Sequence, residues 1–208
     1  MSQVLKEAIE QGALQLGVTV DEGQSERLAD LLVSVLKVND RINIIGPCTP
    51  AQAVERHLLD SLGLLRLVDR TKGINSWIDI GTGGGFPGLV WAIMRPDLNL
   101  LLVDSVGKKA ALARKHAIDF RLSNVTVLPT RFEEIPSPLE PTGMVSRATF
   151  APNEWISRAT AFLTAGGAIV ATMGGSADPE VLKGASHIDR IKLPPSGLER
   201  TNVLYEVV

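Results

Sequence analysis

A glycine-rich turn is the stretch of this sequence best suited to chemistry. Five of the eight residues from Gly81 to Gly88 are glycine, and they follow a predicted strand over 77–80. Glycine lets a ligand approach the backbone closely. Pro87 suits the first turn of a following helix, whose free N–H groups point toward the same place. The turn therefore predicts a nucleotide-type ligand at the end of a strand.

Two acidic residues lie near this turn: Asp79 narrows the choice of ligand, whereas Asp104 suits a ribose in either ligand class. Asp79 precedes the first glycine by two residues, and Asp104 follows the apolar run 100–103, 23 residues beyond Gly81. At that second spacing an acid accepts hydrogen bonds from a ribose. A carboxylate at Asp79 suits a cationic ligand without phosphate, which describes S-adenosylmethionine better than a dinucleotide. Each acid also has a structural interpretation, Asp79 as a strand-end carboxylate and Asp104 as a helix cap.

The glycine spacing is compatible with both ligand classes. The pattern Asp79-x-Gly81-x-Gly83-x-Gly85 is typical of class I methyltransferases, whereas Gly83-x-Gly85-x-x-Gly88 also meets the dinucleotide pattern. An NAD-dependent oxidoreductase on the same core is therefore an alternative, although the sequence shows no hydride-transfer site.

Arg147 directly follows the predicted strand 143–146. Ligands of open α/β sheets bind at the carboxyl ends of the strands. An unpaired arginine at that edge would be costly, so we expect Arg147 to face an acid, a phosphate or a base.

A short helical stretch contains Arg56, His57, Asp60 and Ser61, a set that could suggest a hydrolytic triad. On one helix these residues are close neighbours, so Arg56 and Asp60 are expected to form an i,i+4 salt bridge. Ser61 also lacks the strand-to-helix elbow that exposes a nucleophile. Two interpretations remain, a solvated helix face and a polar wall over the ligand.

Basic residues gather in one segment, 105–131, which has a net charge of +5 with Asp119 as its one acid. We expect His116 on the exposed face of the helix in this segment. That face is either a solvated surface or a contact for RNA phosphates. The expected buried side consists of Val106, Ala110, Ala113, Ala117 and Phe120. The basic residues are Lys108, Lys109, Arg114, Lys115, Arg121 and Arg131.

These residues must be positioned by two kinds of structure. Helical periodicity over 3–16, 21–39 and 50–68 predicts an N-terminal helical extension, residues 1–73, with Thr49 and Pro50 starting its third helix. Residues 74–208 are predicted to be an α/β core with a Rossmann-like, doubly wound and mainly parallel sheet. We expect helices between the first five strands and an antiparallel hairpin of the last two at one edge. The predicted strands are 77–80, 100–103, 125–128, 143–146, 168–172, 188–193 and 203–207.

Composition excludes several classes of protein. The chain is 208 residues long, with 45% apolar residues, a net charge of −2 and one cysteine, Cys48. Disorder, a disulfide scaffold and a broadly basic surface are excluded, and no metal site is expected. The N-terminus has no pattern of a secretory signal, and the uncharged stretch 159–177 predicts a buried strand between glycine turns rather than a membrane span. We therefore expect a cytoplasmic protein, and no pattern indicates an oligomeric state.

Several ordered motifs between residues 39 and 207 are similar to one known family. The chain resembles the glucose-inhibited division protein B family, bacterial enzymes that methylate a guanine N7 in 16S ribosomal RNA. The motifs are Arg56-His57-x-Leu59-Asp60-Ser61, the turn from Asp79 to Gly88, Asp104-Ser105-x-x-Lys108-Lys109, Asn124-Val125, Arg131-x-Glu133 and Ser146-Arg147-Ala148.

The resemblance implies S-adenosylmethionine as cofactor, Arg147 as the catalytic residue near the transferred methyl group, and 16S ribosomal RNA or the small ribosomal subunit, in the 530-loop region, as partner. The implied cofactor-binding residues are Asp79, Gly81, Thr82, Gly83, Gly85, Phe86, Asp104, Ser105, Phe132, Glu133 and Arg147. The implied RNA-binding residues are Arg56, His57, Lys108, Lys109, Arg131 and Arg200.

Guanine N7 has a free lone pair and can accept a methyl group without losing a proton, so no general base is expected. The protein must instead place N7 in line with the methyl carbon. One departure from the family is Met173, where a lysine is usual. A non-catalytic RNA-binding or assembly factor that retains the cofactor site is therefore a second alternative.

Overall fold

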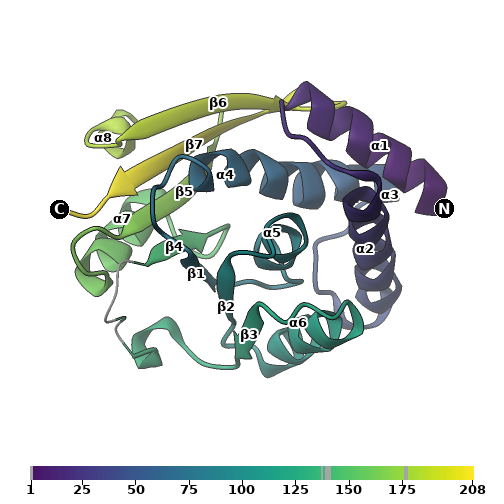
Figure 1. The fold of residues 1–208 in the computed structure, drawn as a ribbon, viewed down its shortest axis with the longest axis horizontal. Helices are drawn as coiled ribbons and strands as arrows, with labels where there is room; N and C mark the ends of the chain where they lie inside the picture. Colours follow the sequence, from purple (N-terminus) through teal and green to yellow (C-terminus); the bar gives the residue numbers. More distant parts are fainter. Residues whose placement is uncertain (1, 137, 139–141, 176–177) are drawn as a thin grey trace.

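The protein is described by a computed structural model of residues 2–136, 138, 142–175 and 178–208. In this part of the chain seven strands form one sheet, in the order β3-β2-β1-β4-β5-β7-β6 (Figure 1). The first five strands are parallel, and β7 runs antiparallel to both β5 and β6. The strands are β1 (Ser76–Ile80), β2 (Asn99–Val103), β3 (Val125–Leu128), β4 (Gly143–Ser146), β5 (Ala168–Gly174), β6 (His187–Leu193) and β7 (Leu198–Glu206).

This architecture confirms the predicted Rossmann-like sheet with an antiparallel hairpin at one edge. The hairpin differs in one respect, because β7 begins at Leu198, earlier than predicted, and its residues 200–206 pair with the whole of β5. The segment Leu198–Asn202 is mostly polar and has little strand propensity of its own. All of this segment pairs with β6, and its last three residues also pair with β5, so its neighbours make it a strand and β6 is left at the edge of the sheet.

The connections between the parallel strands include α5 (Gly88–Met94), α6 (Gly107–Asp119) and α7 (Pro152–Phe162). The prediction of a helix between β3 and β4 is wrong for the described residues, where only the 3₁₀ turn η2 (Phe132–Glu134) occurs. Pro136 and Pro138 follow this turn, and proline cannot donate the backbone hydrogen bonds that a helix needs. A short helix, α8 (Pro179–Leu182), follows β5.

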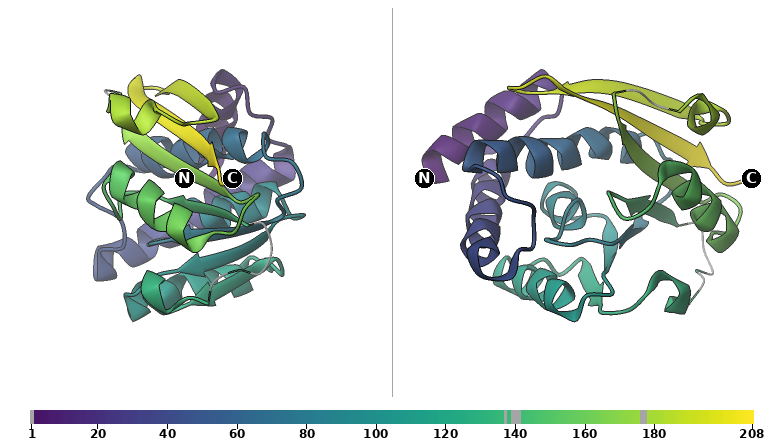
Figure 2. Two further views of the ribbon diagram at one scale, coloured as in Figure 1. Left: turned by 90° about the vertical axis from the view of Figure 1, so that its left-hand side faces the viewer. Right: turned by 180° about the vertical axis from the view of Figure 1, so that it is seen from behind.

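The N-terminal helices are α1 (Ser2–Gln15) and α2 (Glu22–Ile42), followed by one continuous helical stretch made of α3, η1 and α4. Thr49 caps this stretch and Pro50 starts it, as predicted. The expected regular helix over 50–68 is not uniform, because α3 (Pro50–Ala53) and α4 (Asp60–Val68) are joined by the π-helical η1 (Val54–Leu59). Seen from behind, α1 and α2 lie at the side of the molecule opposite the C-terminus, and the helical stretch that ends in α4 runs from that side across the middle (Figure 2).

The helical extension and the sheet share a core. One apolar cluster runs from Ile9 and Leu28 in the N-terminal helices to Trp77 and Leu102 in the strands. The fully buried Trp91 donates from its indole N–H to the carbonyl of Ser61 at 2.9 Å, which ties α5 to α4. The domain boundary after residue 73 stays a prediction. Because the helices and the sheet share one apolar cluster, this boundary does not divide the protein into two hydrophobic cores.

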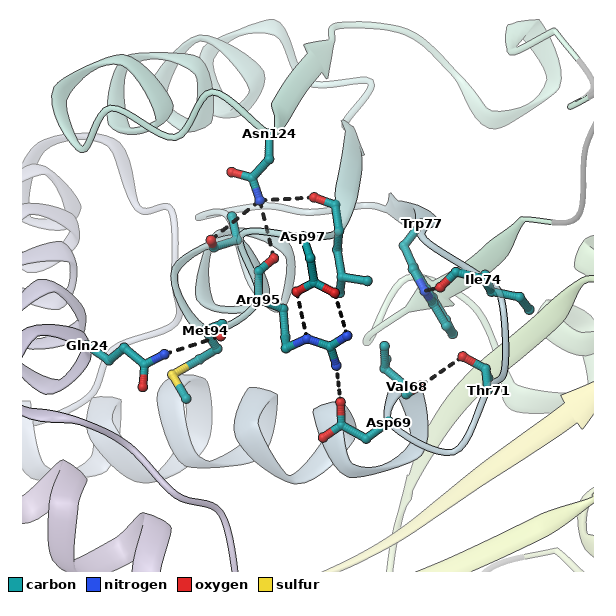
Figure 3. A network of polar contacts seen from close by, with 12 residues as sticks. Gln24, Val68, Asp69, Thr71, Ile74, Trp77, Met94, Arg95, Asp97 and Asn124 are labelled. Carbon is teal, nitrogen blue, oxygen red and sulfur yellow. Dashed lines mark hydrogen bonds and ion pairs between the residues drawn. The ribbon is translucent and has the colours of Figure 1, made fainter.

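A polar network lies at the amino ends of the strands (Figure 3). The Asn124 side chain donates to the carbonyl oxygens of Ala92, Arg95 and Leu98, at 3.5, 3.4 and 3.0 Å. The Arg95 side chain pairs in turn with Asp97 at 2.7 Å. Asn124, one of the family-like positions, therefore holds the end of α5 against the start of β3.

His116 is fully buried, contrary to the expectation that it lies on an exposed face. Helix α6 packs against α2 as well as the sheet, so His116 faces α2, where its Nε2 lies 3.0 Å from the Ser34 hydroxyl. Val106, which the helical pattern places on the buried side, is instead 39% exposed. Ala110, Ala113 and Ala117 are buried as predicted, together with Leu112.

Burial of His116 predicts that the protein loses stability in mild acid. Burial lowers the pKa of His116 to about 4, against 6.5 for a free histidine. The unfolded chain therefore takes up a proton at His116 as pH falls below 6.5, while the folded chain does not, so the free energy of unfolding drops over this window. In urea unfolding, His116→Gln should lose about 2 kcal/mol less than the wild type between pH 7.5 and 5. Equal losses in both proteins would contradict this role of His116.

No helix in the described ranges is long and apolar enough to cross a membrane. The uncharged stretch 159–177 contains the end of α7 and the buried strand β5, which agrees with its interpretation as a strand. Among the residues that the structure describes, no group of histidine, cysteine and acidic side chains is arranged to hold a metal ion.

Candidate active site

A cleft of about 920 Å³ opens at the carboxyl ends of β1, β2 and β4. Its wall includes the loop after α2, at Ile44 and Ile45, and Met173 of β5. Most residues predicted to bind a cofactor or RNA meet there, although they come from distant parts of the chain. Those that line it are Arg56, His57, Gly81, Thr82, Gly83, Phe86, Asp104, Ser105, Lys109, Arg131, Phe132, Glu133, Arg147 and Arg200.

The glycine turn leaves β1 directly into the cleft. Gly81 has a φ of 73° and Gly83 a φ of 56°, a backbone conformation that side chains disfavour. The Gly81 N–H donates to the Val103 carbonyl at 2.8 Å, which holds the turn against the end of β2. A side chain at Gly81 would collide with Thr149, whereas the space around Gly83 is open. The backbone at this turn is therefore accessible to a ligand.

Asp79 lies beneath the turn and is only 1% exposed. Its Oδ2 accepts hydrogen bonds from the Thr82 hydroxyl at 2.7 Å and from the Gly88 N–H at 2.9 Å. Its Oδ1 has no hydrogen-bond partner among the described residues. Burial raises the pKa of Asp79 to about 6, and the two hydrogen bonds limit the rise. Asp79 thus stabilises the turn from below and does not line the cleft. Contact of its Oδ1 with the cofactor stays a prediction.

Asp104 connects the turn to α6 at the cleft wall. Its Oδ2 accepts from the Gly83 N–H at 2.9 Å and its Oδ1 from the Val106 N–H at 2.8 Å. Each carboxylate oxygen has a second lone pair, so these bonds leave Asp104 able to accept from a ligand hydroxyl. The capping and ligand-binding interpretations of Asp104 are therefore compatible.

Arg147 faces an acid, as the sequence predicts. Its Nη1 donates to Asp60 Oδ2 at 3.0 Å and to the Arg56 carbonyl at 2.6 Å, and its Nη2 lies 3.2 Å from His57 Nδ1. The guanidinium carbon lies 6.0 Å from the centre of the Phe86 ring. These contacts fix the position of the guanidinium at the side of the cleft.

The Asp60 carboxylate forms ion pairs with two arginines. Besides Arg147, the Nε of Arg200 on β7 lies 3.2 Å from Asp60 Oδ1, and the Asp60 side chain is 3% exposed. The predicted salt bridge from Arg56 to Asp60 does not form in the structure. A π-helix has more residues per turn than an α-helix, so the i,i+4 relation does not hold along η1. Arg56 is exposed and lines the cleft instead.

The uncharged His57 side chain forms part of the cleft wall. Burial lowers the pKa of His57 to about 3, with further lowering by the positive charges of Arg147 and Arg56. Its ring stacks on Phe86 with 5.2 Å between the ring centres. Ser61 is fully buried and its hydroxyl donates to the His57 carbonyl, not to the ring. This geometry excludes a hydrolytic triad and agrees with the polar-wall interpretation.

Comparison with known proteins shows the family. Residues 24–193 match the family model described as rRNA small subunit methyltransferase G. The chain belongs to this family. A ribosomal RNA small subunit methyltransferase G from Pseudomonas syringae pv. tomato is 36% identical over 137 residues, which cover 66% of this chain and 63% of that protein. The chain thus matches less than two thirds of the length of this relative. A relative of the same name from Myxococcus xanthus is 34% identical over 203 residues, 91% of each chain.

The fold has structural relatives outside the rRNA small subunit methyltransferase G family. A crystal structure of an O-methyltransferase from Bacillus cereus, solved in complex with SAH, aligns with a TM-score of 0.59 at 17% identity. The alignment covers 99% of this chain and 100% of that chain. This structural similarity supports a class I methyltransferase fold for the chain.

Several predicted site residues lie outside the cleft lining or are held by other contacts. Asp79, Gly85 and Lys108 do not contribute to the lining, whereas the neighbouring Lys109 does. The carboxylate of Glu133 is paired with Arg158 at 2.8 Å. The ring of Phe132 packs in an aromatic group, with 5.2 Å between its centre and that of Phe162.

The sequence did not indicate that Asp60 pairs with Arg200. The i,i+4 spacing in the sequence predicts a pair of Asp60 with Arg56. An ion pair between Asp60 and Arg200, which are far apart in the chain, leaves no such pattern. The lining by Ile44 and Ile45 was also missed. Their backbone N–H groups donate to the Asn39 side chain, a contact that no local pattern indicates.

Proposed function

We propose that this protein is an S-adenosylmethionine-dependent methyltransferase that methylates N7 of a guanine in 16S ribosomal RNA, in the 530-loop region. The observation that carries the proposal is the meeting of the glycine turn, Asp104 and the anchored Arg147 in one cleft of a chain that belongs to the rRNA small subunit methyltransferase G family.

The residues of the cleft fit this cofactor. An open backbone at Gly83 and the Asp104 carboxylate offer contacts for an adenosine, and the buried Asp79 has an oxygen without a partner in the described chain. Acids beneath and beside the turn favour a cationic ligand and oppose the pyrophosphate of NAD, which disfavours the oxidoreductase alternative. When bound, the cofactor supplies an electrophilic methyl group on a cationic sulfur. The residues that would hold it are Gly81, Thr82, Gly83, Asp104, Ser105 and Phe132.

The protein's task in the reaction is orientation. Guanine N7 attacks with its own lone pair, so no residue has to remove a proton first. Arg147, fixed by Asp60 and the Arg56 carbonyl, directs its remaining donors to a phosphate beside the target base. With the cofactor bound, the cleft walls would orient the base toward its methyl group and exclude water.

RNA binding is assigned to the basic residues around the cleft. Arg56, Lys109, Arg131 and Arg200 line it, and Lys108 is exposed beside it at the start of α6. RNA affinity requires local positive charge rather than a basic molecule, so the net charge of −2 is compatible with this assignment. We place the reaction in the cytoplasm, with the small ribosomal subunit or its RNA as partner.

Asp104→Ala should weaken cofactor binding. The substitution removes the proposed ribose acceptor and frees the Gly83 and Val106 N–H groups that the carboxylate holds. We expect the Kd for S-adenosylmethionine, measured by calorimetry, to rise about 30-fold or more. Asp119→Ala removes an acid at the far end of α6 and should leave the Kd unchanged. An unchanged Kd in Asp104→Ala would contradict the role of Asp104.

Transfer of labelled methyl groups tests whether the protein is an enzyme or an RNA-binding factor. Purified protein would be incubated with labelled S-adenosylmethionine and either small ribosomal subunits or naked 16S RNA from cells lacking the protein. We expect label in the RNA of at least one substrate. If the protein binds both cofactor and RNA but transfers no label, the assembly-factor alternative is correct.

A further inference from the structure

His57 presents a hydrogen-bond donor whose position is set by its neighbours. Its Nδ1 lies 3.2 Å from Nη2 of Arg147. A guanidinium can only donate, so Nδ1 must accept, and the ring proton of the neutral imidazole must reside on Nε2. The contact with Arg147 thereby selects one tautomer of His57.

The ring is also held in place. It stacks on the buried Phe86 with an angle of 27° between the ring planes. Among the residues that the structure describes, no hydrogen bond to His57 Nε2 is found, and the residue lines the cleft. Burial and the two adjacent arginines hold the pKa of His57 near 3, so the ring stays neutral at physiological pH. The Nε2–H group is therefore a preorganised neutral donor available to a ligand.

Arg147 alone leaves part of the base unrecognised. Both hydrogens of its Nη1 are used, by Asp60 and by the Arg56 carbonyl, and one hydrogen of Nη2 points to His57. A bidentate contact of an arginine to O6 and N7 would also block the nitrogen that must react. A separate single donor is better suited to recognising the base.

We propose that His57 is a specificity-determining residue that recognises O6 of the target guanine through Nε2–H. This assignment rests on the proposed methylation of guanine N7. O6 is an acceptor beside N7 on the same edge of the base, so one donor there orients guanine and leaves the N7 lone pair free. Adenine presents an amino group at that position, and two donors facing each other are unfavourable. His57 thus selects guanine over adenine.

The test uses base analogues that separate O6 from N7. The guanosine that the wild-type protein methylates is replaced, in ligated 16S RNA, by inosine or by 2-aminopurine. Inosine retains O6 and N7, whereas 2-aminopurine retains N7 but lacks O6. We expect wild-type single-turnover rates on guanosine and inosine to be similar, and the rate on 2-aminopurine to be about tenfold lower.

Two variants at one position provide the comparison. His57→Leu removes the donor, so its rate on guanosine should fall about tenfold and should not fall further on 2-aminopurine. His57→Gln places an amide N–H near the position of Nε2 and should keep the preference for inosine over 2-aminopurine. Cofactor Kd and urea unfolding of both variants report any loss of folding, which would not remove the analogue preference by itself.

The outcomes distinguish this assignment from the function on which it rests. If His57→Leu prefers inosine over 2-aminopurine as strongly as the wild type does, His57 does not recognise O6, and the proposed function is unaffected. If the wild type transfers no methyl group to guanosine, both the proposed function and the assignment are wrong.

Discussion

Replacing Arg147 with alanine should reduce the single-turnover rate of methyl transfer by about 100- to 1000-fold. The guanidinium at the side of the cleft is held by three separate contacts, to Asp60, to the Arg56 carbonyl and to His57. Such a fixed group can orient a base, and a small misplacement of the reacting atoms has a large effect on rate. Cofactor affinity should stay within about twofold, because the glycine turn and Asp104 are untouched.

The control for Arg147 is a lysine. Arg147→Lys keeps the positive charge but cannot contact Asp60, the Arg56 carbonyl and His57 together. If orientation by the guanidinium matters, Arg147→Lys should recover only a small part of the rate. Wild-type turnover in Arg147→Ala would remove this residue from the reaction.

Asp60→Asn should have the largest effect on stability. One carboxylate, almost without exposure to solvent, faces the guanidinium groups of both Arg147 and Arg200. The amide has nearly the same shape but leaves two adjacent positive charges without their shared counter-ion. We expect the free energy of unfolding in urea to fall by about 3 kcal/mol. Methyl transfer should fall as well, because Arg147 loses its strongest anchor.

Asp189→Asn is a matched control for Asp60→Asn. Its carboxylate pairs with Arg66 at 3.2 Å, away from the cleft and with more exposed partners. A pair of this kind contributes about 1 kcal/mol or less. If Asp60→Asn and Asp189→Asn destabilise the protein equally, the double ion pair of Asp60 has no special importance.

The parallel part of the fold could be predicted because its signals are local. Val125–Leu128 and Gly143–Ser146 are apolar runs bounded by turn residues, and both strands have the predicted bounds. The polar start of β7 has no such signal and is a strand because of its neighbours in the sheet. His116 was misplaced for a related reason, since helical periodicity does not show that α2 covers a second face of α6.

Some features of the candidate site could likewise be predicted from local sequence signals, and others could not. Gly81, Asp104 and Arg147 all follow predicted strands, and the carboxyl ends of parallel strands meet at one edge, so their convergence could be predicted. The pairing of Asp60 with Arg200 joins residues far apart in the sequence and depends on the position of β7. The π-helical turn that displaces Arg56 from Asp60 also has no recognisable local pattern.

The most direct test of the central claim is chemical detection of N7-methylguanosine in 16S RNA. Borohydride followed by aniline cleaves RNA at this nucleoside, so the position of the methyl group can be read from the fragment. RNA treated with wild-type protein and S-adenosylmethionine should be cleaved at a single guanosine, and RNA treated with Arg147→Ala should remain almost uncleaved. Methylated RNA that this chemistry does not cleave would contradict transfer to guanine N7.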